Sequence, residues 1–429
     1  MQPMRVAAGL LALALASAWE RPSAAEGTNP CAERVSQSNV VACAMRASVI
    51  VYEEQRGLDA VRARRRSAAV LLPSNPVVAI DVGRRASTTG PDSIDWRAAL
   101  SQELEIGGQR SSRIEVANAE GDAQRARVQA AEREVAGVAL SAYFDALAAQ
   151  QEKRLADRLV ELATALKTLA QARSDMGLAS AVDAEIAGAA AIRLEQARFA
   201  ADRRVYATAV ALMALVGLDP AATPVRVEGD LVPLPIADSD RTSLVVVALA
   251  RRADIVVADA ERRAQGRRAE MYRRLRVPNP TVSLFAQSDR YNERAFGVGL
   301  AFPIPLPAPI GRTYAGEIAE AEALAERASG EIERVRRSVR IEVLVAANAV
   351  ASRRTEASTF DPDRIRRADE ALTAIARELQ ARRLSVRDAL LAEQSLVELL
   401  QAHVEARRQL CLASVELARA TGSFNGGTQ

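Results

Sequence analysis

Residues 94–110, IDWRAALSQELEIGGQR, join a strand pattern to the start of a very long helix. Over residues 94–106 an apolar side chain recurs at every second position, with Gln102 as the exception, and polar side chains occupy most of the positions between. Side chains alternate between the two faces of a sheet, so this stretch predicts a strand with one apolar face. Gly107-Gly108 then ends the pattern. From Ser112 to Met176 the chain runs 65 residues without a proline, which predicts a single helix roughly 100 Å long.

The same organisation recurs about 205 residues further along the chain. Matching residues keep nearly the same offset: Asn75-Pro76 and Asn279-Pro280, Ser180 and Ser385, Asp183 and Asp388, Gly217 and Gly422. A common offset over most of the chain indicates two copies of one structural unit. The predicted order within each copy is a helix, two strands, a very long helix, a tight turn and a final helix.

The predicted boundaries divide the chain into a signal peptide (1–25), a first repeat (26–217), a crossover linker (218–240), a second repeat (241–422) and a tail (423–429). The expected elements of the first repeat are helices 35–69, 112–176 and 181–216 with strands 77–85 and 94–106. Those of the second are helices 243–276, 314–382 and 386–421 with strands 281–288 and 294–304. Asp361-Pro362 should kink or break the longest helix. Each long helix nearly matches two short helices laid end to end, so we expect a bundle about 100 Å tall.

The N-terminus predicts export from the cytoplasm. Arg5, an apolar run over residues 6–19 and small residues before Glu26 have the pattern of a cleaved signal peptide, and the run is shorter than the ~20 residues of a membrane-spanning helix. The residues before Cys31 do not fit a lipoprotein cleavage site, so lipidation is not expected. Cys31 and Cys43 are compatible either with a disulfide in an oxidising compartment or with two free thiols. Cys411 is expected to pack inside a helix bundle.

Composition and motifs exclude several classes of protein. The chain has 57 Lys and Arg against 54 Asp and Glu, and this net charge of +3 argues against a nucleic-acid-binding domain. The basic cluster at residues 62–66 is interpreted as a solvated helical face. His403 is the only histidine and is expected to be exposed, so no metal site or cofactor is predicted. The motifs of nucleotide-binding loops and nucleophile elbows are absent, which predicts a protein that is not an enzyme.

The four strands carry the strongest functional prediction. They are long enough to cross a bilayer when tilted, and Trp96, Phe296 and Phe302 are predicted to face lipid. A soluble sheet with one buried face would show the same alternation. Four strands in lipid would leave two unpaired edges, which hydrocarbon does not tolerate. A membrane location therefore requires several copies of the chain to close one barrel, although their number does not follow from the sequence.

The element order resembles the TolC-like outer-membrane efflux proteins, and most closely their CzcC-like heavy-metal branch. The residues that carry the resemblance are Leu71-Leu72-Pro73, the stretch Leu100–Arg110 and the proline-rich segment Pro303–Gly311. The resemblance implies a mainly helical fold with a small membrane β-barrel: a homotrimer with 12 strands and a helical tunnel through the periplasm. It also implies passive conduction of divalent heavy-metal cations, with a periplasmic adaptor and an inner-membrane RND pump as partners.

Two hairpin tips are the candidate sites that the resemblance indicates. The resemblance implies that the residues of these two tips contact the adaptor; they are Gly177, Leu178, Ser180, Arg383, Leu384 and Ser385. Asp388 resembles the aspartate that constricts the periplasmic entrance of these channels, and Asp183 is a second gate candidate. Ordinary turn and capping chemistry accounts for the same residue types. The alternative function is a periplasmic coiled-coil adaptor of an exporter.

Overall fold

The computed structural model describes residues 31–86, 92–223, 225–235, 240–288, 293–381 and 383–424. The predicted signal peptide lies outside these residues. So do most of the two strand-to-strand loops and the last residues of the tail.

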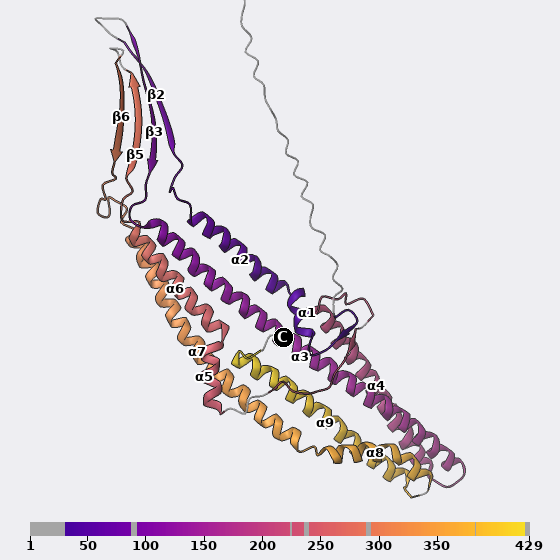
Figure 1. Cartoon of the computed structure of the whole chain (residues 1–429). Coiled ribbons are helices and arrows are strands. Elements are labelled where there is room, and N and C mark those ends of the chain that lie inside the picture. The colour runs from indigo at the N-terminus through magenta and orange to yellow at the C-terminus, as the bar shows by residue number, and fades with distance from the viewer. Residues whose placement is uncertain are drawn as a thin grey trace, which may run out of the picture.

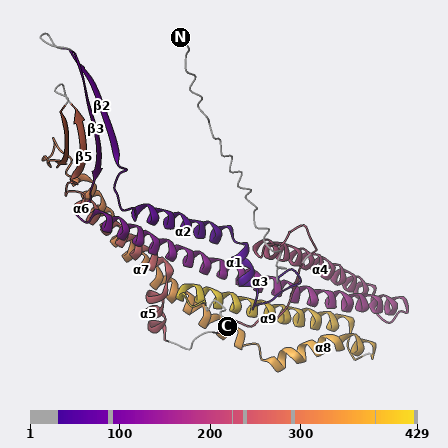
Figure 2. The same ribbon diagram turned by 45° about the horizontal axis from the view of Figure 1, so that its top comes forward.

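The molecule is elongated, with a β-sheet at one end and helices extending away from it (Figures 1 and 2). The strands are β2 (Val77–Arg85), β3 (Ser93–Glu103), β5 (Thr281–Ser288) and β6 (Arg294–Ala301). They form one antiparallel sheet in the order β2-β3-β5-β6. Two strands end three residues earlier than predicted, at 103 and 301. The reason is proline, which has no N–H with which to continue the hydrogen-bond ladder. Pro280 lies opposite the end of β3, and Pro303 follows β6.

The register of the sheet aligns its apolar side chains on one face. Leu100 pairs with both Val78 and Leu284, and Leu284 pairs with Val298. All four side chains are exposed in the single chain. On the opposite face Arg97 stands between Asp81 and Gln287. The sheet therefore has an exposed apolar face and an opposite face of mainly polar and small residues.

The first half of the chain builds its helices around one rod. α3 (Gln109–Asp175) has 67 residues. It packs against α1 (Val40–Ala47) and α2 (Val49–Ala68) along one part of its length and against α4 (Ala181–Leu215) along the other. Gly108 begins the rod with φ +75°, a left-handed conformation that glycine adopts without strain.

The second half has shorter helices in a similar arrangement. They are α5 (Arg241–Arg251), α6 (Ala253–Arg274), α7 (Ala315–Ser358), α8 (Pro362–Gln380) and α9 (Val386–Thr421). The break predicted at Asp361-Pro362 is confirmed, with Pro362 at the first position of α8. The segments predicted as single helices over 35–69 and 243–276 are instead divided. Ser48 and Arg252 adopt extended backbone and end one helix before the next begins.

A compact region at mid-height ties the N-terminal segment to the crossover linker. The two-residue strands β1 (Arg34–Val35) and β4 (Arg226–Val227) pair in parallel. The side chains of Val35 and Val227 join a buried cluster with Tyr143 and Phe144 of α3. Two residues are too few to show alternation, so this pairing has no signal in the sequence.

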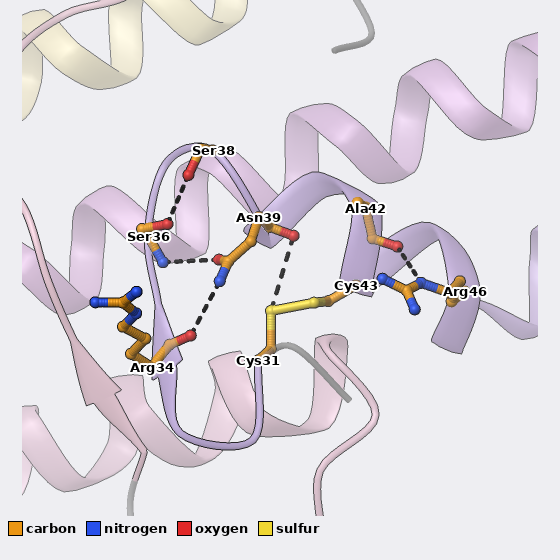
Figure 3. Close-up of a disulfide and its surroundings, with 8 residues drawn as sticks. All are labelled: Cys31, Arg34, Ser36, Ser38, Asn39, Ala42, Cys43 and Arg46. Carbon is orange, nitrogen blue, oxygen red and sulfur yellow. Dashed lines mark hydrogen bonds between the residues drawn. A yellow bond between two sulfur atoms is a disulfide. The ribbon is translucent and has the colours of Figure 1, made fainter. Parts of the chain in front are cut away.

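A disulfide fixes the chain before α1 and resolves the alternative that the sequence left open. Cys31 and Cys43 are bonded, and both are buried. Figure 3 shows the loop between them, in which the Asn39 side chain accepts from the Ser36 N–H at 2.8 Å and donates to the Arg34 carbonyl at 3.0 Å. Cys411 is a free thiol and is buried in the bundle, as expected. Among the described residues, no helix has the length and hydrophobicity needed to cross a bilayer.

Candidate functional site

The first hairpin tip is the turn between α3 and α4, at the end of the bundle remote from the sheet (Figure 1). Gly177 has φ +71°, and its N–H donates to the Ser174 carbonyl at 2.9 Å. The Leu178 N–H donates to the Arg173 carbonyl at 2.8 Å. This pair of bonds is the Schellman termination of a helix and requires a residue that accepts positive φ. Gly177 therefore shapes the turn, and Leu178 is left exposed at its apex.

The second tip, between α8 and α9, uses similar chemistry. The Arg383 N–H donates to the Glu378 carbonyl at 3.0 Å, and the two side chains form an ion pair at 3.5 Å. Leu384 is half-buried and Ser385 is exposed. The structure thus places all six predicted tip residues in two turns at the same end of the molecule.

Each candidate gate aspartate lies in the first turn of a helix capped by serine. The Ser180 hydroxyl accepts from the Val182 N–H at 3.1 Å at the start of α4. At the start of α9 the Ser385 hydroxyl accepts from the Asp388 N–H at 3.1 Å and donates to the Asp388 carboxylate at 2.7 Å. Asp388 is exposed and Asp183 is half-buried. Capping fixes the orientation of Asp388, and its negative charge points into solvent at the tip.

A buried acid that was not among the predicted site residues lies just above the second tip. Glu393 is only 3% exposed, and its Oε1 has no hydrogen-bond partner within the described structure. It lies seven residues from both Val386 and Leu400, in the apolar stripe by which α9 packs into the bundle. Burial raises the pKa of Glu393 to about 7, and the positive charge of Arg193 on α4 opposes the rise. The seven-residue spacing of Val386, Glu393 and Leu400 is the sequence signal that could have revealed the burial of Glu393.

We predict that Glu393→Gln stabilises the protein at pH 8 and not at pH 4.5. The folded state binds the Glu393 proton more tightly than the unfolded chain does, so the ionised carboxyl costs stability as pH rises from about 4.5 to 7. The full cost above that range is roughly 3 kcal/mol. Thermal unfolding followed by circular dichroism would measure the difference. The exposed Glu398→Gln on the same helix is the control, and an equal gain at both pH values would refute the prediction.

The predicted lipid-facing aromatics occupy the sheet end of the molecule. Trp96 and Phe296 lie on its apolar face, and both are exposed. Phe302 follows the end of β6 and is also exposed. Trp96 and Phe296 lie in the half of the sheet away from the helices, and Phe302 lies at its helix-proximal edge.

His403 is not exposed as predicted. Its side chain is half-buried, with its ring 5.4 Å from that of Phe360, which lies in the break between α7 and α8. Burial and the nearby positive charge of Arg407 lower the pKa of His403. In the part of the chain that the structure describes, no three His, Cys, Asp or Glu side chains converge as metal ligands.

Comparisons with known proteins agree with this architecture. Residues 57–218 match the family described as outer membrane efflux protein. The chain is 25% identical over 304 residues to the cobalt-zinc-cadmium resistance protein CzcC of Cupriavidus metallidurans, covering 70% of this chain and 71% of CzcC. It is 30% identical over 236 residues to protein CyaE of Bordetella pertussis, covering 52% of this chain and 49% of CyaE. The solved structure of the outer-membrane channel OprN superposes with a TM-score of 0.72 at 19% identity, covering 90% of this chain and 89% of OprN.

The chain has the fold of the solved outer-membrane channels OprN and CusC, and residues 57–218 match the outer membrane efflux protein family. The matched family and the solved neighbours are proteins of the outer membrane.

Proposed function

We propose that three copies of this chain form the outer-membrane channel of a tripartite RND-type efflux system. The observation that carries the proposal is the four-stranded sheet. In the described residues the outer edges of β2 and β6 lack a partner strand, while one face of the sheet is apolar and exposed. Three sheets joined edge to edge would make a closed barrel of 12 strands and leave no unpaired edge in lipid.

Two repeats of similar design would suit this assembly. A strand pair followed by a helical hairpin occurs in the same order in residues 26–217 and in residues 241–422. Six similar units per trimer would then surround one axis and continue from the barrel into a periplasmic helical tunnel.

The hairpin tips are the proposed contact with a periplasmic adaptor. Exposed apolar side chains surround the first turn, namely Met176, Leu178 and Val182. The second turn offers Arg383 and Ser385. A partner hairpin that supplies apolar groups opposite the first tip and hydrogen-bond acceptors opposite the second would fit this pair of surfaces.

The proposed cargo is divalent heavy-metal cations, which pass through the channel without a resident binding site. Similarity to CzcC, a protein named for cobalt, zinc and cadmium resistance, supports this cargo. Three Asp388 carboxylates at the periplasmic end, with Asp183 nearby, would attract cations and repel anions. The alternative function as a periplasmic adaptor is not favoured, because the matched family consists of outer-membrane proteins.

We predict that Asp388→Asn lowers the cation-over-anion permeability ratio of the channel in planar bilayers and raises its conductance. One unit charge about 4 Å from a permeating ion is worth about 1 kcal/mol in water, favourable for a cation and unfavourable for an anion, so the ratio should fall by at least about fivefold. Asp363→Asn is the matched control, because Asp363 is also an exposed acid in the first turn of a helix. Unchanged selectivity and conductance in the Asp388 variant would remove the gate assignment.

A further inference from the structure

Positive charge is concentrated where the helices meet the sheet. Residues 62–76, 104–115, 267–280 and 302–317, here named the junction layer, contain twelve arginines and four glutamates and no other charged residues. The whole chain has a net charge of only +3. These segments connect α2, α3, α6 and α7 to the four strands, so their charges lie in one layer at the base of the sheet (Figure 1).

Four exposed arginines of the junction layer have no carboxylate partner within the described structure: Arg65, Arg66, Arg110 and Arg276. The Arg110 guanidinium donates to the Ala69 carbonyl at 3.1 and 2.9 Å, and Arg276 donates to the Thr313 carbonyl at 2.9 Å. These bonds hold two of the side chains in place, but they do not neutralise the charge. The layer therefore presents fixed cations to whatever lies beside it.

Apolar and aromatic side chains accompany these cations. Ile304 and Ile310 are 81% and 80% exposed in the proline-rich connection between β6 and α7. The rings of Tyr272 and Tyr314 are stacked at 6.4 Å between centroids, and the Arg312 guanidinium lies 4.6 Å from the centre of the Tyr314 ring. Exposed aliphatic groups, tyrosine rings and arginines at one level are typical of a surface at the boundary between membrane and water.

We propose that the junction layer binds anionic phospholipid headgroups in the periplasm-facing leaflet of the outer membrane. The inference rests on the proposed insertion of the sheet in lipid. With the apolar face of the sheet in the hydrocarbon and the helices in the periplasm, the junction layer lies at the level of those headgroups. Arginine forms paired hydrogen bonds with phosphate oxygens. A net negative headgroup would match the unneutralised charge of the four arginines without a carboxylate partner, and a zwitterionic one would match it less well.

The test compares two lipids on the full-length protein in detergent. Dioleoylphosphatidylglycerol and dioleoylphosphatidylcholine are titrated separately, and bound lipid is counted by native mass spectrometry. The wild type is expected to bind phosphatidylglycerol more tightly, with a preference that weakens at high salt. Each arginine near an anionic surface contributes roughly a fivefold change in affinity, so Arg66→Gln/Arg276→Gln should reduce the preference by about 25-fold. Arg203→Gln/Arg387→Gln is the control, because both of its arginines are exposed and are without an ion pair in the described chain.

The outcomes separate this inference from the proposed function. Equal affinity of the wild type for the two lipids overturns the inference. An equal loss of the preference for phosphatidylglycerol in the two double variants overturns it as well. The oligomeric state and the bilayer conductance of the same preparation are measured in parallel. An oligomer that conducts ions without preferring phosphatidylglycerol contradicts the lipid inference alone. A chain that neither assembles nor conducts contradicts the proposed channel.

Discussion

Leu284→Arg is expected to abolish assembly of the protein in the outer membrane. Leu284 lies near the middle of β5 between Leu100 and Val298, and its side chain is exposed on the apolar face of the sheet. An arginine at the bilayer midplane of a β-barrel costs about 2–4 kcal/mol. Three copies would cost roughly 6–12 kcal/mol, which is comparable to the whole stability of a folded protein.

The matched control places the same charge on the opposite face. Gln287→Arg changes a residue three positions along β5, beside Arg97, on the polar face that would line the channel. Membrane fractionation followed by gel electrophoresis of unheated samples measures the amount of assembled oligomer. The Leu284 variant should fall at least tenfold below the wild type and the Gln287 variant should remain near it. Equal effects of the two substitutions would contradict the assignment of the faces.

Loss of the disulfide is expected to lower the stability of the helical part of the protein substantially. Cys31 and Cys43 are 12 residues apart and belong to the buried cluster that includes Tyr143 and Leu231. A covalent loop of this length restricts the unfolded chain, so Cys31→Ala/Cys43→Ala should lower the free energy of unfolding by about 3 kcal/mol. The variant should also release the segment that carries β1 from the crossover linker.

Chemical denaturation of the double variant, with and without reductant, measures this effect. Reductant should destabilise the wild type by a similar amount and leave the double variant unchanged. Cys411→Ala serves as the control for a buried thiol. Burial raises the pKa of Cys411 to about 12, so its thiol stays protonated and attacks the disulfide poorly. A double variant as stable as the wild type would show that packing alone holds the N-terminal segment.

The elements with a strong local signal could be predicted from the sequence. Period-two alternation located β2 and β5 to the residue, and Pro362 marked the break between α7 and α8. Serine and glycine at the ends of helices located the two hairpin tips. Each of these features depends on backbone geometry within a few neighbouring residues, which is the information that a single sequence carries.

Features that depend on distant contacts could not be predicted. The β1–β4 pair joins segments about 190 residues apart, and the environment of His403 depends on Phe360 from another helix. The burial of Glu393 requires the neighbouring helices to close around α9. The junction layer was noticed only as the basic cluster at residues 62–66, because its other arginines come from three further segments that the fold brings together.

The most direct test of closure by several chains is the mass of the purified mature protein by native mass spectrometry in detergent. The account predicts a complex of three chains that sediments with outer membranes before extraction and aggregates when the detergent is withdrawn. A single chain that stays dissolved and folded without detergent would contradict it.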